Sequence, residues 1–167
     1  MINSTVSDCT LVNLPTETGK CEILTSVENG KTIPFHTKRV YYLYQVPSDA
    51  CRGAHAHKAL RQLIVAACGS FDLILDDAKE QKKISLNCSN KGVLIVPGIW
   101  REIVNFSSDA VCLVLASELY DELDYIRDYN LFVKIKIANR DLRIAGGLRK
   151  KCILGLKCSI WRHHGRP

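Results

Sequence analysis

Between residues 9 and 117, short apolar or alternating segments follow one another, with clusters of turn-forming residues between them. Such alternation is typical of half-buried strands, and a long series at this spacing is typical of an all-β sandwich or barrel. The expected strands are residues 9–14, 21–26, 39–46, 53–58, 62–68, 70–75, 82–86, 92–96, 102–106 and 110–117. Clusters such as Pro47-Ser48-Asp49 suit the turns between them. About ten strands at this spacing predict a jelly roll.

The segment that follows the strands changes character. Residues 120–132 are expected to form an acidic turn and then a short helix, because Asp121, Glu122 and Asp124 would lie near its N-terminal end, where the helix dipole favours acidic groups. A chain of 167 residues, 47% of them hydrophobic, buries one core rather than two. We therefore expect one domain, residues 1–133, and an extension of uncertain structure, residues 134–167.

The formal net charge of +6 is concentrated in that extension. Residues 134–167 hold ten of the 23 Lys and Arg residues and a single acidic residue, Asp141, so the rest of the chain is slightly acidic. The extension shows no clear period, and we expect it to be loosely structured, with binding of nucleic acid or anionic lipid as the alternative. For the protein as a whole we expect neither a nucleic-acid nor a membrane partner.

The location of the protein is indicated by two negative features of the sequence. It has no apolar run long enough to cross a bilayer, and residues 1–8 lack the basic and apolar regions of a signal peptide. The eight cysteines are scattered without a C-x-x-C pair, which favours reduced, mostly packed thiols over a disulfide framework. These features predict a cytoplasmic protein.

Two histidines stand at alternating positions in Arg52-Gly53-Ala54-His55-Ala56-His57-Lys58. Side chains alternate along a strand, so His55 and His57 project from one face and are able to converge on one small ligand. Imidazole titrates near neutral pH, which suits general acid–base catalysis. The pattern by itself also allows both rings to lie on the outer face of a sheet.

The surroundings of this pair resemble the cupin motifs. Gly53-x-His55-x-His57 with Gln62 and Gly69 resembles the first motif, and the stretch from Gly92 through Pro97-Gly98 to Arg101 and Asn105 resembles the second. The resemblance implies a small cupin jelly-roll barrel with its site inside. Metal-binding cupins present three histidines and a glutamate, whereas Gln62 and Arg101 occupy two of those positions here. Arginine has no lone pair to donate, so we expect no metal and no other cofactor.

Several further motifs make the resemblance closer. The stretches 38–44, 52–58, 75–77, 100–102, 114–117 and 120–127 are similar to those of the dTDP-sugar 3,4-ketoisomerases, over about residues 11–132. The resemblance implies a homodimeric, metal-independent isomerase that converts dTDP-4-keto-6-deoxy-D-glucose into a dTDP-3-keto-6-deoxy-D-hexose through an enediol. It also implies a place in deoxysugar biosynthesis for surface polysaccharide such as the O-antigen of lipopolysaccharide.

The resemblance assigns roles to particular residues. His55 would be the base that takes the proton from sugar carbon 3, and His57 would assist in delivering protons across the enediol. Trp100 is a candidate for stacking on the base or sugar, with an ordinary core position as the alternative. Arg52, Lys58 and Arg101 are candidates for stabilising the transient negative charge. The expected substrate-binding residues are Arg39, Tyr41, Arg52, Lys58, Gln62, Trp100 and Arg101.

Other readings of the same residues remain open. A sugar-nucleotide epimerase would use a related barrel and the same carbanion chemistry, and a non-catalytic cupin would bind the sugar nucleotide without turning it over. The sequence also departs from the family: an arginine often precedes the glycine of the N-terminal turn, where this chain reads Glu17-Thr18-Gly19-Lys20. That departure puts one phosphate or sugar contact in doubt unless Lys20 replaces it.

Overall fold

The computed structural model describes residues 3–155 of the chain, and side chains as far as residue 142. The strands are β1 (Thr10–Asn13), β2 (Thr16–Thr18), β3 (Ile23–Thr25), β4 (Arg39–Tyr44), β5 (Arg52–His57), β6 (Gln62–Cys68), β7 (Phe71–Asp76), β8 (Gln81–Leu86), β9 (Lys91–Ile95), β10 (Trp100–Val104), β11 (Val111–Ala116) and β12 (Tyr125–Ile126). The helices are two 3₁₀ turns, η1 (Val6–Asp8) and η2 (Glu122–Asp124), and one α-helix, α1 (Tyr129–Gly155).

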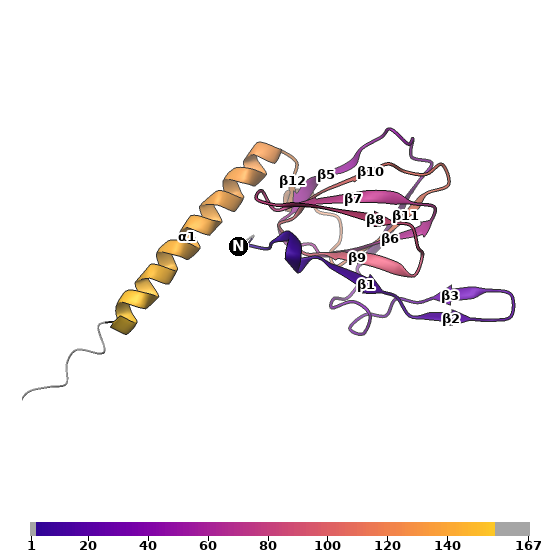
Figure 1. Ribbon diagram of the computed structural model, residues 1–167, viewed down its shortest axis with the longest axis horizontal. Coiled ribbons are helices and arrows are strands. Elements are labelled where there is room, and N and C mark those ends of the chain that lie inside the picture. The colour runs from indigo at the N-terminus through magenta and orange to yellow at the C-terminus, as the bar shows by residue number, and fades with distance from the viewer. Residues whose placement is uncertain (1–2, 156–167) are drawn as a thin grey trace, which may run out of the picture.

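The strands form two five-stranded antiparallel sheets that face each other (Figure 1). One sheet has the order β1-β9-β6-β11-β4 and the other β12-β5-β10-β7-β8, while β2 and β3 form a separate hairpin that projects from the barrel (Figure 1). Strands that are distant in sequence therefore lie side by side, as in a jelly roll. The prediction of an all-β jelly-roll barrel is confirmed, and all ten expected strands are present within a few residues of their expected bounds.

The main core lies between the two sheets and follows the two-residue period of the strands. On β7, Phe71, Leu73 and Leu75 are buried, and on β11 Cys112 and Val114 are buried with them. Side chains at the intervening positions face the other way, because successive Cβ atoms of a strand point to opposite sides of its sheet. The alternation read from the sequence is thus the alternation that builds the core.

Strand β4 lies at the edge of its sheet and presents two different faces. Arg39, Tyr41 and Leu43 are half-buried and point into the barrel. The outer β4 patch, which consists of Val40, Tyr42 and Tyr44, is more than half exposed at every residue, and the two tyrosine rings lie 5.6 Å apart. An edge strand with large exposed apolar side chains is uncommon in a monomer, because it favours association.

Helix α1 is longer than the short helix expected from the sequence. Asp128 caps its start by accepting hydrogen bonds from the backbone N–H groups of Asn130 (2.7 Å) and Leu131 (3.1 Å). Phe132 is fully buried in a second cluster with Ala56, Trp100 and Ile126 on the outer side of β5 and β10. The helix then runs on to Gly155, away from the barrel (Figure 1).

The expectation of a loosely structured extension is therefore wrong for residues 134–155, which are helical, and it falls outside the described residues for 156–167. The first turns of this part are docked by polar contacts. Lys136, which is 3% exposed, donates to the backbone carbonyls of Ser4 and Gly98, and Arg140 donates to the carbonyl of Asp77 (2.7 Å). Ile135 is the apolar residue of this segment that packs on the Phe132 cluster, and the basic Lys136 and Arg140 supply the polar contacts, so hydrophobic periodicity did not indicate the helix.

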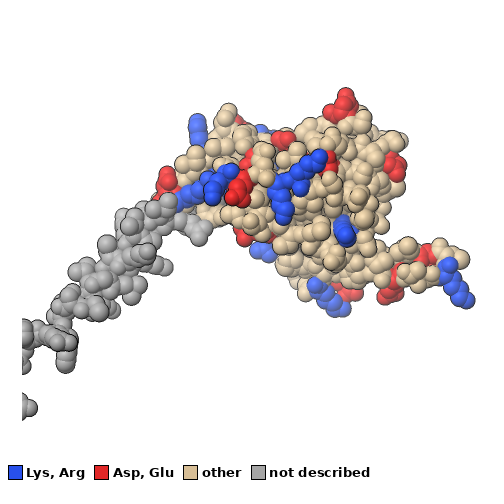
Figure 2. Space-filling view, in the orientation of Figure 1, with Lys and Arg blue, Asp and Glu red and all other residues tan. Residues whose placement is uncertain are grey.

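The charged side chains of the barrel are mixed in sign. Figure 2 shows Lys and Arg interspersed with Asp and Glu on the face that it presents. Of the helices among residues 3–155, none is both long and apolar enough to span a membrane.

Candidate active site

The two histidines project from β5 into the barrel, as their spacing predicts. Their ring centroids are 5.0 Å apart and the rings meet edge to face. Gly53 precedes them with φ +86°, and a Cβ atom there would lie 2.7 Å from the carbonyl oxygen of Arg101, so only glycine fits. The register between β5 and β10 shifts at this point, and the resulting bulge directs the side chains of Arg52 and His55 toward one cavity.

Arg101 joins the two rings. It comes from β10, is 4% exposed, and its Nη2 lies 2.5 Å from His55 Nε2 and 2.9 Å from His57 Nε2, while its Nη1 donates to the carbonyl of His55 (3.0 Å). A guanidinium only donates, so both Nε2 atoms accept. Burial lowers the pKa of Arg101 to about 10, and the group stays charged at neutral pH. The third ligand position of a metal-binding cupin is thus filled by a fixed positive charge.

The opposite ring nitrogens fix the protonation state of both rings. Nδ1 of His55 lies 2.7 Å from the carbonyl of Gly53, and Nδ1 of His57 lies 2.8 Å from Oδ2 of Asp124, so each Nδ1 carries a proton that it donates. Burial, followed by the nearby charge of Arg101, lowers the pKa of His55 to about 3 and that of His57 to about 2. Both imidazoles are therefore uncharged throughout the neutral range.

These lowered pKa values predict that acid destabilises the fold. In the unfolded chain each histidine takes up a proton near its ordinary pKa of 6.5, whereas in the folded chain it resists protonation, so stability falls as the pH drops from 6.5 toward 3. For His57 alone we expect a loss of up to about 2 kcal/mol between pH 7 and pH 5. Urea unfolding at the two pH values measures the loss. It should shrink in His57→Gln and persist in His36→Gln, whose ring is exposed; an unchanged pH dependence in His57→Gln contradicts this account.

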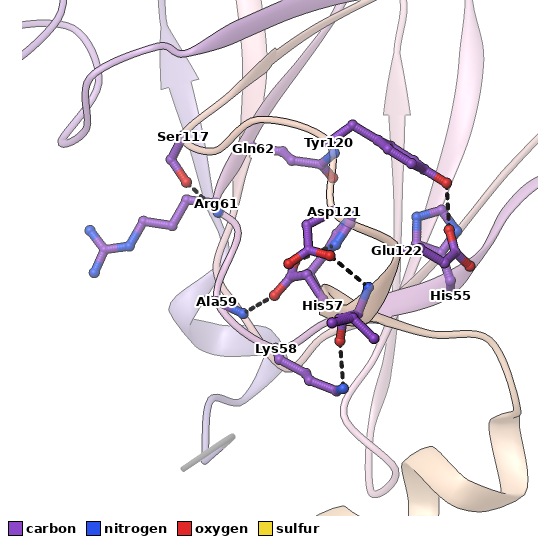
Figure 3. Close-up of polar contacts among 12 residues, drawn as sticks. His55, His57, Lys58, Ala59, Arg61, Gln62, Ser117, Tyr120, Asp121 and Glu122 are labelled. Atoms are coloured by element: carbon purple, nitrogen blue, oxygen red, sulfur yellow. Dashed lines mark hydrogen bonds and ion pairs between the residues drawn. The ribbon is translucent and has the colours of Figure 1, made fainter.

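Asp124 is a functional candidate to which the sequence assigned no individual role, although it lies in the expected acidic turn and in the family-like stretch 120–127. Its Oδ2 accepts from His57 Nδ1, its Oδ1 accepts from the N–H of Ala59 (2.7 Å), and its backbone carbonyl accepts from the N–H of Lys58 (2.9 Å). Figure 3 shows the turn around Asp121 and Glu122 lying against the end of β5, where the Lys58 ammonium and Ala59 N–H meet it. The carboxylate therefore fixes both the tautomer and the orientation of His57.

A cavity of about 380 Å³ opens beside the histidines. Its walls combine an apolar floor with cationic and aromatic side chains: Arg39, Tyr41, Leu43, Arg52, Gly53, His55, Ile64, Arg101, Ile103, Val114, Tyr120, Tyr125 and Arg127. Tyr125 packs on both imidazoles, with centroids 4.7 Å from His55 and 4.4 Å from His57. A pocket of this size and lining suits a small ligand with a negatively charged part.

Arg39 is the cavity residue best placed to bind the negatively charged part of such a ligand. Its guanidinium lies 5.1 Å from the centroid of Tyr41 and 5.5 Å from that of Tyr120, both on the cavity wall. Within the part of the chain that the structure describes, its Nε and Nη2 atoms are buried without a hydrogen-bond partner. Unpaired buried donors on a cation are costly, and an anionic ligand would satisfy them.

The expected site residues fall into two groups. Arg39, Tyr41, Arg52, His55 and Arg101 line the cavity, and His57 lies directly behind it under Arg101 and Tyr125. The residues that do not line it are Gln62, Lys58 and Trp100.

Each residue of the second group has another partner. Gln62 is buried and donates to the hydroxyl of Tyr41 (2.8 Å), so it acts by placing that ring. Lys58 donates to the carbonyl of Leu123 (2.5 Å) (Figure 3). Trp100 is buried against Phe132 and donates to Glu102 (3.0 Å), which is the core position that the sequence left open as the alternative. Tyr120, Tyr125 and Arg127 line the cavity and were not expected to.

The donor set does not resemble a metal site. Among residues 3–142, whose side chains the structure describes, no three or more His, Cys, Asp or Glu side chains are grouped closely enough to hold a metal ion. The two Nε2 lone pairs that a cation would need already accept from Arg101.

Comparisons with known proteins agree with this geometry. The family model described as "FdtA: WxcM-like, C-terminal" matches residues 7–137. A protein of Aneurinibacillus thermoaerophilus named TDP-4-oxo-6-deoxy-alpha-D-glucose-3,4-oxoisomerase is 46% identical over 111 residues, which are 66% of this chain and 80% of that protein.

Two solved structures are similar over most of their length. A 3,4-ketoisomerase from Helicobacter canadensis is 43% identical with a TM-score of 0.76, and the match covers 77% of this chain and 97% of that one. A histidine-to-asparagine variant of the 3,4-ketoisomerase QdtA from Thermoanaerobacterium thermosaccharolyticum, in complex with TDP-4-keto-6-deoxyglucose, is 40% identical with a TM-score of 0.75, and the match covers 77% of this chain and 93% of that one. The two structural matches leave about a quarter of this chain uncovered, and the family match ends at residue 137.

Proposed function

Because this chain belongs to the FdtA family (WxcM-like, C-terminal), we propose that it catalyses the reaction for which its relatives are named. It is a sugar-nucleotide 3,4-ketoisomerase that acts on dTDP-4-keto-6-deoxy-D-glucose and moves the ketone from carbon 4 to carbon 3. The observation that supports this most directly is the pair of uncharged imidazoles beside a cavity with a cationic wall.

The proposed chemistry is a proton transfer between neighbouring carbons. His55 takes the proton from carbon 3 at Nε2, because its Nδ1 already donates to the carbonyl of Gly53. The electron pair of the broken C–H bond forms the enediolate, and a proton is then delivered to carbon 4 while the hydroxyl proton passes from the oxygen on carbon 3 to the oxygen on carbon 4. His57, 5.0 Å away ring to ring, assists in these deliveries.

Arg101 limits when this chemistry begins. With its guanidinium on both Nε2 atoms, His55 is a very weak base, since its pKa is lowered to about 3. A base that works at neutral pH requires the substrate to draw Arg101 away from the ring, for example toward an oxygen that becomes negative in the enediolate. Arg39, with its unpaired N–H groups, is placed to hold the diphosphate.

The test of this proposal is proton NMR of dTDP-4-keto-6-deoxyglucose incubated with the full chain in deuterated water. We expect a 3-keto product with solvent deuterium at carbon 4. Inversion without migration of the ketone would identify an epimerase. Tight dTDP binding without exchange of the carbon 3 proton would identify a non-catalytic binding protein, and either result overturns the proposal.

We also propose that the protein is a homodimer that associates through the outer β4 patch. Val40, Tyr42 and Tyr44 are 58%, 60% and 57% exposed on a strand whose second edge has no partner strand in the described residues. A two-fold arrangement would bury this patch against its own copy. Sedimentation equilibrium of the full chain tests it, and a monomer at micromolar concentration would contradict it.

The setting that we propose is the cytoplasm, in a pathway that makes deoxysugars for a surface polysaccharide such as an O-antigen. It rests on the sugar-nucleotide substrate, which such pathways use. We propose that the reaction needs no metal, because Arg101 holds a positive charge where the ion would lie.

A further inference from the structure

We infer that Lys136, on the C-terminal helix, is a positioning residue for His57, acting through the backbone of Gly98. The inference deepens the proposed function, on which its activity readout rests. Lys136 does not line the cavity. Its hydrogen bonds in the described residues go to Ser4 and Gly98, neither of which lines the cavity.

The connection consists of two buried hydrogen bonds in series. The ammonium of Lys136 donates to the carbonyl of Gly98 (2.9 Å), and the N–H of Gly98 donates to the carbonyl of His57 (2.7 Å). Gly98 is buried with φ +78°, in a tight turn between β9 and β10. Gly98 carries both hydrogen bonds, one on each of the two peptide groups that flank its Cα, so a displacement of this residue moves the end of β5 on which the His57 ring stands.

The second contact of Lys136 anchors the connection. The same ammonium donates to the carbonyl of Ser4, so the N-terminal segment, helix α1 and the Gly98 turn meet at one buried cation. Phe132, one turn earlier in the helix, packs in a cluster with Ala56, which stands between the two histidines on the other face of β5. The helix thus supports β5 from behind while Lys136 fixes its end.

The position of His57 matters because its ring makes a hydrogen bond at each of its two nitrogens. Nδ1 must reach Asp124 and Nε2 must reach Arg101, at 2.8 Å and 2.9 Å. Hydrogen bonds weaken steeply when the donor–hydrogen–acceptor angle falls below about 120°, so a tilt of the ring affects both at once. Loss of the support at the His57 carbonyl is therefore expected to loosen both.

The experiment compares Lys136→Met with Lys134→Met in the full chain. Lys134 is exposed on the same helix and serves as the matched control. For Lys136→Met we expect kcat to fall about tenfold while KM and the Kd for dTDP stay within about twofold, because misplacement of a catalytic group lowers the rate more than it weakens binding. Lys136→Arg, which keeps a donor, should recover part of the loss.

A second readout does not depend on turnover. The proton on His57 Nδ1, identified by its disappearance in His57→Gln, should shift in the ¹H NMR spectrum of Lys136→Met and stay in place in Lys134→Met. An unchanged signal and unchanged kcat in folded Lys136→Met overturn the inference, as does a loss of dTDP affinity equal to the loss of kcat. Should Lys136→Met fail to fold, Lys136→Gln replaces it, since its side chain is polar but uncharged and one atom shorter than that of lysine. An inactive parent would refute the proposed function, whereas the NMR signal still tests the position of His57.

Discussion

Replacing His55 by asparagine should lower kcat for ketone migration about 1,000-fold, which is within the range that a positioned general base contributes. Asparagine keeps a polar side chain of similar size but has no nitrogen able to accept the proton from carbon 3. Because the cationic residues of the cavity remain, the Kd for dTDP should change by less than about threefold. Progress of the reaction is followed by NMR of the sugar ring protons, together with titration calorimetry for dTDP.

The matched control is His36→Asn, since His36 is exposed and lies outside the cavity. It should retain the activity of the parent. If His55→Asn keeps more than about a tenth of the parent kcat, another residue is the base and His55 has a different role in the site.

Replacing Asp124 by asparagine should lower kcat about 100-fold. Two N–H donors point at this side chain and need two acceptor oxygens, whereas an amide offers only one. The carboxylate accepts from His57 Nδ1 and from the N–H of Ala59. In either orientation of the amide its NH₂ group faces another N–H donor. The ring must then tilt or change its tautomer, and the second outcome places a proton on Nε2 against the donating Arg101.

Asp121→Asn is the control for this variant. Asp121 lies in the same turn, and its side chain accepts one hydrogen bond in the described residues, from the N–H of Leu123 (2.9 Å), which an asparagine oxygen also accepts. Its kcat should stay close to that of the parent. Kinetics of both variants at pH 7, with the dTDP Kd measured alongside, decide the matter: equal activities of the two variants would show that Asp124 does not orient a catalytic ring.

The barrel was predictable because its strands alternate strongly. Phe71, Leu73 and Leu75 are separated by single residues, and such a pattern permits one pairing of faces. Strand β2 escaped prediction because Thr16, Glu17 and Thr18 carry no apolar side chain, and all three are exposed. Strand β12 has only two residues and exists because it pairs with β5, where Tyr125 lies opposite His57 and Ile126 lies opposite Ala56.

The site was predictable in part. Residues an even number of positions apart on a strand share a face, and this parity explains both the residues that were predicted correctly and those that were not. His55 and His57 share a face, as do Arg39 and Tyr41. Parity alone would have excluded two further candidates: Lys58 follows the inward-facing His57, and Trp100 precedes the inward-facing Arg101, so each faces the other way.

Other members of the site lie in the stretch 120–127, whose family-like sequence did not indicate how it reaches the cavity. Asp124, Tyr125 and Arg127 reach it only through the turn and short strand that fold back on β5. Arg52 is an exception to parity, since the bulge at Gly53 turns it toward the cavity. Tertiary contacts rather than local preferences decide such positions.

One guanidinium nitrogen serving two imidazoles has a consequence for how this site can change over evolutionary time. Substitution of any one of His55, His57 or Arg101 leaves a buried donor or lone pair without its counterpart. Single substitutions at these three positions are therefore disfavoured. We expect that a homologue that differs at one of them also differs at the other two.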